Sequence, residues 1–118
     1  NIWDLGNQET RRICREMSAL HAKYGDYIIA CAKAASQTGA PIVRAMEYAY
    51  PHCGYGGITD QYLLGDRILV APVLKKGQRR RKVCIPTGKW QLGDKIYSNE
   101  TVTLSCPVDT LLYFERID

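Results

Sequence analysis

The stretch that decides the fold is Pro41–Gly77, which reads PIVRAMEYAYPHCGYGGITDQYLLGDRILVAPVLKKG. It contains two short apolar runs, Gln61–Leu64 and Ile68–Leu74, separated by Gly65-Asp66. A Gly-Asp pair between two apolar runs is typical of a hairpin turn, so we predict two antiparallel strands here. The preceding segment, His52–Thr59, holds three glycines and is predicted to be a loop.

The chain after Gly77 continues as short strand candidates divided by turn residues. In Glu100–Cys106, apolar side chains alternate with hydroxyl side chains, which is the two-residue period of a strand with one buried face. Short strands with frequent turns predict a small antiparallel β-sandwich. The expected strands are Lys82–Ile85, Lys89–Leu92, Lys95–Tyr97, Glu100–Cys106 and Leu111–Arg116.

The first third of the chain has a helical period. Apolar residues recur at steps of three and four, which places them on one stripe of an α-helix. Gly39 followed by Pro41 predicts the end of this helix, and Gly25 predicts a kink or a break within it. The expected fold class is α+β, with a long N-terminal helix in residues 1–40 and a small antiparallel β-sandwich domain in residues 41–118. The stripe consists of Ile13, Met17, Leu20, Tyr24, Tyr27, Cys31 and Ala34.

Length and charge restrict the class of protein only broadly. The 118 residues fall in the size range of one domain, and no apolar run is long enough to cross a membrane. The net charge is +4. A basic run, Lys75–Lys82, carries much of this excess and is interpreted as a solvated hairpin loop leading into a strand. The alternative is a phosphate-binding surface, but we expect no nucleic-acid partner.

Two features bear on the cellular compartment, and they point in opposite directions. Five cysteines without a C-x-x-C spacing are expected to be small buried hydrophobes, which favours a reducing compartment. Asn99-Glu100-Thr101 matches the acceptor sequence for N-glycosylation, which matters only in a secretory compartment.

The acidic residues do not form a recognisable catalytic pair. Glycoside hydrolysis with retention needs two carboxylates about 5–5.5 Å apart. None of the 12 acidic residues follows a strand with the flanking glycines and aromatics that mark such a carboxylate, and Asp66, Asp94 and Asp109 lie in turn contexts. The two histidines and five cysteines lack a zinc-site spacing. We therefore predict no catalytic residue, no cofactor and no metal in this chain.

Six short motifs follow one another over nearly the whole chain: Gly39–Arg44, Asp60–Asp66, Ile68–Leu74, Pro86–Trp90, Pro107–Asp109 and Leu112–Glu115. In their order and spacing they resemble glycoside hydrolase family 31, the α-glucosidase and α-xylosidase family, especially its branch related to the myogenesis-regulating glycosidase. The chain departs from the usual pattern of the family at Ala45, where a proline commonly follows the arginine.

The resemblance implies that residues 1–40 are the last helical part of a (β/α)₈ barrel and that residues 41–118 are the adjoining β-domain. It also implies that the family's nucleophile and acid/base, both aspartates, lie upstream of Asn1. The chain would then be a structural C-terminal segment of a retaining α-glycosidase, inactive alone. Trp3 would lie on the loop after the last barrel strand and is the predicted substrate-binding residue, because barrel active sites are built from such loops.

A stand-alone carbohydrate-binding β-module without catalysis is the alternative. Trp90 follows a turn and has an aromatic face suited to a sugar ring, although packing inside the sandwich is the more ordinary role for it. If the chain occurs without the rest of an enzyme, the apolar stripe of the helix would be exposed, so we also expect self-association of the isolated fragment.

Overall fold

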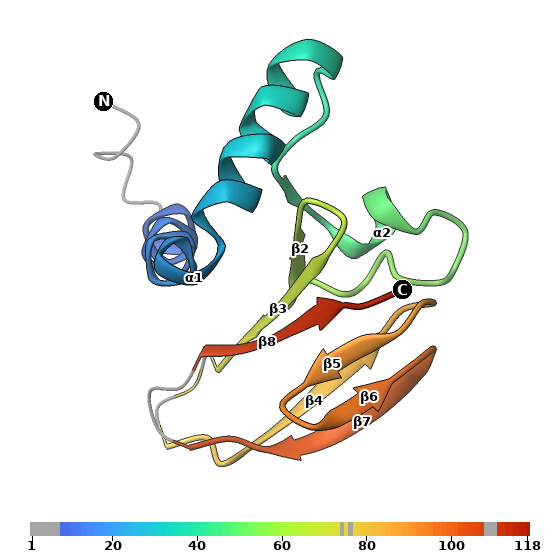
Figure 1. The fold of residues 1–118 in the computed structure, drawn as a ribbon. Coiled ribbons are helices and arrows are strands. Elements are labelled where there is room, and N and C mark those ends of the chain that lie inside the picture. The colour runs from blue at the N-terminus through green and yellow to red at the C-terminus, as the bar shows by residue number, and fades with distance from the viewer. Residues whose placement is uncertain (1–7, 74, 76, 108–110) are drawn as a thin grey trace. The chain divides into compact units, whose positions relative to one another are not determined.

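The structure is a computed structural model that describes residues 8–73, 75, 77–107 and 111–118 (Figure 1). Trp3, Leu74 and the last two residues of the predicted Pro107–Asp109 motif lie outside the described residues. The chain divides into two compact units, Asn1–Ala40 and Pro41–Asp118, and each is described by itself. In the described residues, no helix is both long and apolar enough to cross a membrane.

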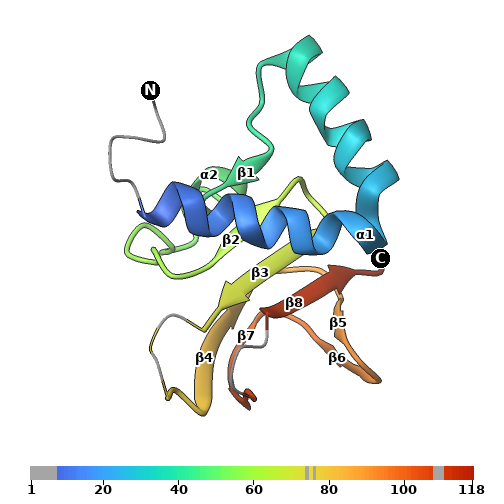
Figure 2. The ribbon, with the colours of Figure 1, turned by 90° about the vertical axis from the view of Figure 1, so that its left-hand side faces the viewer.

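The first unit contains one long bent helix, α1 (Gln8–Thr38). Tyr24 leaves helical geometry with φ −119° and ψ 26°, directly before Gly25, and Figure 2 shows the two halves of α1 meeting there at a sharp bend. The predicted kink is thus confirmed. The helix ends as expected: Gly39 adopts φ +77° and donates its backbone N–H to the Ala35 carbonyl at 2.8 Å. A left-handed glycine after the last turn satisfies such a carbonyl without Cβ strain.

The second unit is a β-sandwich built from two antiparallel sheets. The larger sheet has the strand order β1-β2-β3-β8-β5-β6, and the smaller one pairs β4 with β7. The predicted α+β class is confirmed. The bounds are β1 (Val43–Arg44), α2 (Met46–Ala49), β2 (Tyr62–Leu64), β3 (Ile68–Pro72), β4 (Arg80–Ile85), β5 (Trp90–Leu92), β6 (Lys95–Tyr97), β7 (Glu100–Ser105) and β8 (Leu111–Arg116).

The predicted hairpin in the deciding stretch is present. β2 pairs with β3 in the register Leu63↔Leu69, and Gly65 makes the turn with φ +63°. β3 then pairs along its whole length with β8, the strand at the end of the chain, with Ile68 opposite Glu115. β3 is buried at all five positions, which explains why its sequence is a continuous apolar run without alternation.

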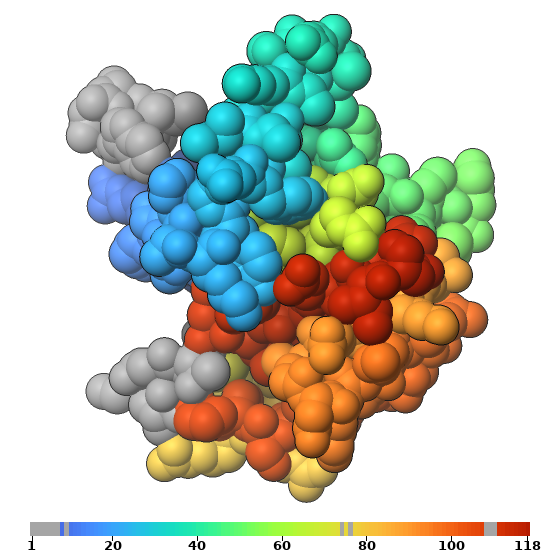
Figure 3. Space-filling model, in the orientation of Figure 1, coloured from blue at the N-terminus to red at the C-terminus, as the bar shows by residue number. Residues whose placement is uncertain are grey.

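The core of the second unit lies between the two sheets. Side chains from both sheets and from the one-turn helix α2 interlock there, as in other sandwiches. On the outside, Ile96 of the β5–β6 hairpin is exposed, and the orange side chains of this hairpin stand on the surface in Figure 3. The buried cluster consists of Met46, Leu63, Leu69, Ala71, Val83, Ile85, Trp90, Leu112 and Phe114.

Among the described residues of the basic run, the interpretation as a solvated loop leading into a strand is wrong only for the burial of Arg81 and for the start of the strand. β4 begins at Arg80, two residues before the predicted start, and Arg81 is buried. Burial alternates along β4, so that Arg81, Val83 and Ile85 face inward while Arg80 and Lys82 are exposed. Arg81 therefore lies at a buried position of the two-residue alternation in β4. A charged side chain can be buried there because it is hydrogen-bonded.

Candidate functional site

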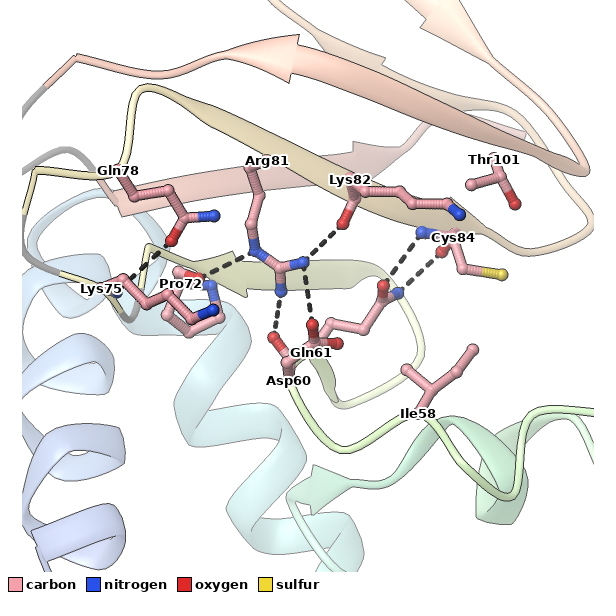
Figure 4. Close-up of a pocket in the computed structure, with 10 residues that line it drawn as sticks. All are labelled: Ile58, Asp60, Gln61, Pro72, Lys75, Gln78, Arg81, Lys82, Cys84 and Thr101. Carbon is pink, nitrogen blue, oxygen red and sulfur yellow. Dashed lines mark hydrogen bonds and ion pairs between the residues drawn. The ribbon is translucent and has the colours of Figure 1, made fainter.

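The second unit contains a cavity of about 500 Å³ beside the free edge of β4, which we call the β4 hollow. Figure 4 shows that its wall comes from the segment before β2, the end of β3 and the following turn, and the strands β4 and β7. Among the described residues of this wall, three side chains are basic and one is acidic. The lining residues are Ile58, Asp60, Gln61, Pro72, Lys75, Gln78, Arg81, Lys82, Cys84 and Thr101.

Arg81 is the central side chain of the hollow. Its Nε donates to the Pro72 carbonyl at 3.0 Å, and its two terminal nitrogens donate to the carbonyls of Lys82 and Asp60. Nη1 also pairs with Asp60 Oδ2 at 3.2 Å. The Arg81 side chain is 5% exposed and that of Asp60 is 55% exposed, so water screens the ion pair on one side. The bond from Arg81 to the Pro72 carbonyl is buried, so it contributes more to the stability of this arrangement than the screened ion pair does.

Gln61 forms a second link across the hollow. Its amide nitrogen donates to the Cys84 carbonyl at 2.7 Å, and its amide oxygen accepts from the Cys84 N–H at 3.0 Å. The side-chain amide thus satisfies both backbone groups of one β4 residue, as the backbone of a neighbouring strand would. Gln61 is 5% exposed, so leaving either partner unpaired would be costly.

Together, side chains cover the outer backbone groups of β4. The carbonyls of Arg80, Lys82 and Cys84 accept hydrogen bonds from Gln78, Arg81 and Gln61. An uncovered edge strand is a template for pairing with another chain, and capping its carbonyls removes that template. The polar groups of the β4 hollow therefore hold the two sheets together and protect the edge of β4.

Asp60 carries the one carboxyl group among the described residues that line the hollow, whereas retaining glycoside hydrolysis uses two. Among the described residues, no group of three or more histidine, cysteine or acidic side chains is placed to hold a metal ion. The bonds of Arg81 and Gln61 make the described lining a structural link between neighbouring segments.

A second polar cluster lies where β8 ends. Arg116 Nε donates to Asp118 Oδ1 at 2.8 Å, and the Lys89 backbone N–H donates to the same oxygen at 3.1 Å. These two bonds, that from Arg116 foremost, lower the pKa of Asp118 from 3.8 to about 2. Arg116 also donates to the Tyr50 hydroxyl at 3.3 Å. Burial, partly opposed by Arg116, raises the pKa of Tyr50. The cluster joins β8 to the segments around Tyr50 and Lys89.

Trp90 is packed inside the sandwich, as the more ordinary interpretation expected. It has no exposed surface, and its indole N–H donates to the Thr87 carbonyl at 2.9 Å. A buried indole cannot stack on a sugar ring, so the observation that motivated a stand-alone sugar-binding module no longer supports it. Trp3 lies outside the described residues and remains a prediction. The links through Gln61 and Arg81 were not foreseen, although the inward phase of Arg81 in β4 was a signal for one of them.

The sequence comparison now identifies the family. Residues 39–116 match the model of the glycosyl hydrolase family 31 C-terminal domain. The chain belongs to glycosyl hydrolase family 31. It is 35% identical to an isomaltosyltransferase of Sporosarcina globispora over 76% of the chain. It is 33% identical to the myogenesis-regulating glycosidase of Mus musculus over 86% of the chain.

Solved structures of family 31 enzymes have the same fold in this region. A Flavobacterium johnsoniae family 31 dextranase complexed with glucose superposes with a TM-score of 0.78 and 30% identity over 93% of the chain. A family 31 α-xylosidase from a soil metagenome complexed with xylose superposes with a TM-score of 0.76 and 33% identity over 98% of the chain.

The chain corresponds to a small part of these proteins. It spans 9% of the isomaltosyltransferase, 15% of the myogenesis-regulating glycosidase and 18% of the α-xylosidase. The residues matched to the family are those of its C-terminal domain, which agrees with the resemblance seen in the motifs.

Proposed function

We propose that this chain is the C-terminal segment of a retaining α-glycosidase that hydrolyses O-glycosyl bonds in carbohydrates, and that its own role is structural. The observation that carries the proposal is the match of residues 39–116 to the family's C-terminal domain. Among the described residues that line the β4 hollow, Asp60 alone has a carboxyl group, which supports the structural role. Residues 1–40 are proposed as the last helical part of the catalytic barrel, which carries both catalytic aspartates elsewhere.

Two activity measurements test this proposal. The purified 118-residue chain should hydrolyse no aryl α-glycoside, while the protein that contains it should release the sugar with its α configuration retained, as proton NMR of the fresh product would show. Turnover by the isolated chain that disappears when one of its own acids is replaced would overturn the structural role.

Transfer in place of hydrolysis is a second candidate for the parent protein. The isomaltosyltransferase that is 35% identical to this chain, and a 1,6-α-glucosyltransferase that is 33% identical over 72% of it, motivate this candidate. A retaining enzyme forms a glycosyl intermediate that water normally hydrolyses, and a sugar hydroxyl reacting in place of water would give transfer. Product analysis with a maltooligosaccharide decides between them: longer products indicate transfer, and glucose alone indicates hydrolysis.

We also propose that Trp3 contributes to the sugar site of the parent enzyme, because loops after barrel strands build such sites. Trp3→Ala in the parent should raise KM for the sugar substrate with little change in stability. Trp90→Phe, at a buried position, is the contrasting variant and should lower stability instead. An unchanged KM for Trp3→Ala would show that Trp3 does not contribute to substrate binding.

A further inference from the structure

The tripeptide Asn99-Glu100-Thr101 begins in the turn between β6 and β7 and continues into β7, and the proposed function does not use it. It has the form Asn-X-Thr with X other than proline, the acceptor sequence for N-linked glycosylation. All three residues are exposed. An acceptor sequence is usable only where the protein leaves it accessible, and this one lies on a surface turn.

The turn is fixed without the Asn99 side chain. Asn99 has φ +47°, and its backbone N–H donates to the Pro86 carbonyl at 2.9 Å. The Glu100 carboxylate accepts the Ser98 backbone N–H at 3.1 Å. In the part of the chain that the structure describes, no hydrogen bond engages the Asn99 side-chain amide. The amide nitrogen that glycosylation requires is therefore available.

The backbone presents both required residues of the acceptor sequence in ordered positions. Asn is among the residues that adopt φ > 0 most readily, which suits it to position 99. Thr101 lies in extended strand β7, opposite Cys84, where a β-branched residue is favoured and its side chain is exposed. The asparagine and the threonine are therefore held in place and accessible together.

We propose that Asn99 is the attachment site of an N-linked glycan. The co-substrate is an oligosaccharide linked to a lipid diphosphate, and the transferase is that of the secretory pathway. The Asn99 amide nitrogen attacks C1 of the first sugar, the bond from C1 to the diphosphate oxygen breaks, and the lipid diphosphate leaves. The amide nitrogen loses one proton to a base of the transferase, and nothing is oxidised or reduced. The proposal places the parent protein in the secretory pathway.

The site lies at the start of an uncovered strand edge. Because the N–H and C=O of Cys84 both bond to Gln61, away from β7, the pair Cys84↔Thr101 is not hydrogen bonded across the sheet. The antiparallel pattern then directs the backbone groups of Thr101, Thr103 and Ser105 to the opposite edge of β7. β7 has no second neighbour among the described strands. A bulky, hydrated glycan on Asn99 would hinder another chain from pairing there.

The test uses the protein as purified from its source organism. Trypsin releases residues 96–116 as one peptide, because Lys95 and Arg116 are consecutive cleavage sites. Treatment with peptide-N-glycosidase in heavy-oxygen water should convert Asn99 to a labelled aspartate, and a sample without the enzyme controls for spontaneous deamidation. Recovery of the same peptide with unmodified asparagine and no label would overturn the proposal.

Matched variants of the parent protein, secreted from a eukaryotic host, give a second test. Asn99→Asp keeps a residue that tolerates φ > 0 and should lower the apparent mass by one glycan. Thr101→Val should do the same, while Thr101→Ser and Thr103→Val should not. Equal masses for Asn99→Asp and the unsubstituted protein would overturn the proposal. A negative result leaves the proposed glycosidase role untouched, because that role does not require the glycan.

Discussion

The Arg81 guanidinium satisfies backbone carbonyls that a neighbouring strand would otherwise satisfy. It donates to Pro72, Lys82 and Asp60, and these bonds join β4 to the end of β3 and to the segment before β2. Sequence alone presents Arg81 as one of six basic residues between positions 75 and 82. The inward phase of Arg81 in β4 was a signal that its side chain is buried, but two of its three carbonyl partners could not be predicted, because they lie 9 and 21 residues earlier in the chain.

Replacing Arg81 should therefore destabilise the protein far more than replacing the next residue. Arg81→Met keeps an apolar stem of similar length but leaves buried carbonyls without donors, at a cost of about 2–3 kcal/mol of unfolding free energy. Lys82→Met, at an exposed position, should change it by less than about 0.5 kcal/mol. Urea denaturation of the two variants would measure the difference. Similar midpoints for both would show that the Arg81 bonds are not needed.

Gly88 is restricted both by its backbone and by a neighbour. It has φ +102°, and a Cβ there would lie 2.8 Å from Arg116 Nε. Gly93 also has positive φ, +63°, but a Cβ there would meet nothing within 4 Å. Gly93→Ala should cost about 1–2 kcal/mol for the left-handed backbone. Gly88→Ala should cost up to about 1 kcal/mol more, because the Arg116 side chain must shift from its hydrogen bonds to Asp118 and Tyr50. Thermal unfolding of the pair would test this, and equal losses would argue against the contact.

At the scale of an element, the end of β8 is held by an ionised carboxylate. The pKa of Asp118 is lowered from 3.8 to about 2 in the folded protein, mainly by Arg116. A lower pKa in the folded state means that the unfolded state binds the proton more readily, so this stabilisation is complete above about pH 3.8 and is lost as the pH falls toward about 2.

Asp118→Asn should flatten the acid side of the stability profile. The unsubstituted protein should lose more stability across that pH window than the variant, as urea midpoints above and below the window would show. Asp94→Asn, at an exposed position in the β5–β6 turn, is the control and should leave the profile unchanged. Equal pH profiles of stability for Asp118→Asn and the unsubstituted protein would show that the Asp118 carboxylate does not stabilise the folded state.

Most elements could be predicted because each has a local signal. The stripe of apolar residues predicted α1, Gly25 its bend, and the Gly65-Asp66 pair the β2–β3 hairpin. The sheet order could not be predicted, because β3 pairs with β8 some forty residues later and no local pattern encodes that contact. The Asn-X-Thr acceptor sequence marked Asn99 locally, whereas the Gln61–Cys84 link of the β4 hollow depends on tertiary contact and had no local signal.

At the scale of the whole molecule, the apolar stripe of α1 implies that another part of a longer protein packs against this helix. Ile13, Met17 and Tyr24 of the stripe are only half-buried in the described structure, although Leu20 is 3% exposed. Outside the stripe, Ile29 of the same helix is 50% exposed. Family 31 relatives are several times longer than this chain, which supplies a reason for such a surface in a segment of the parent enzyme. Contiguous apolar surface of this kind promotes association when it is left in water.

The isolated 118-residue chain should therefore self-associate. Sedimentation velocity should show a concentration-dependent shift from monomer to dimer or larger species, because each chain presents the stripe. Met17→Lys, on the stripe, should raise the protein concentration at which dimers or larger species appear. Thr103→Lys, on the β7 edge, should raise that concentration only if strand pairing drives association. An effect of Thr103→Lys alone would assign association to the β7 edge and strengthen the case that a glycan at Asn99 protects it. A monomer at every concentration would contradict association through either surface.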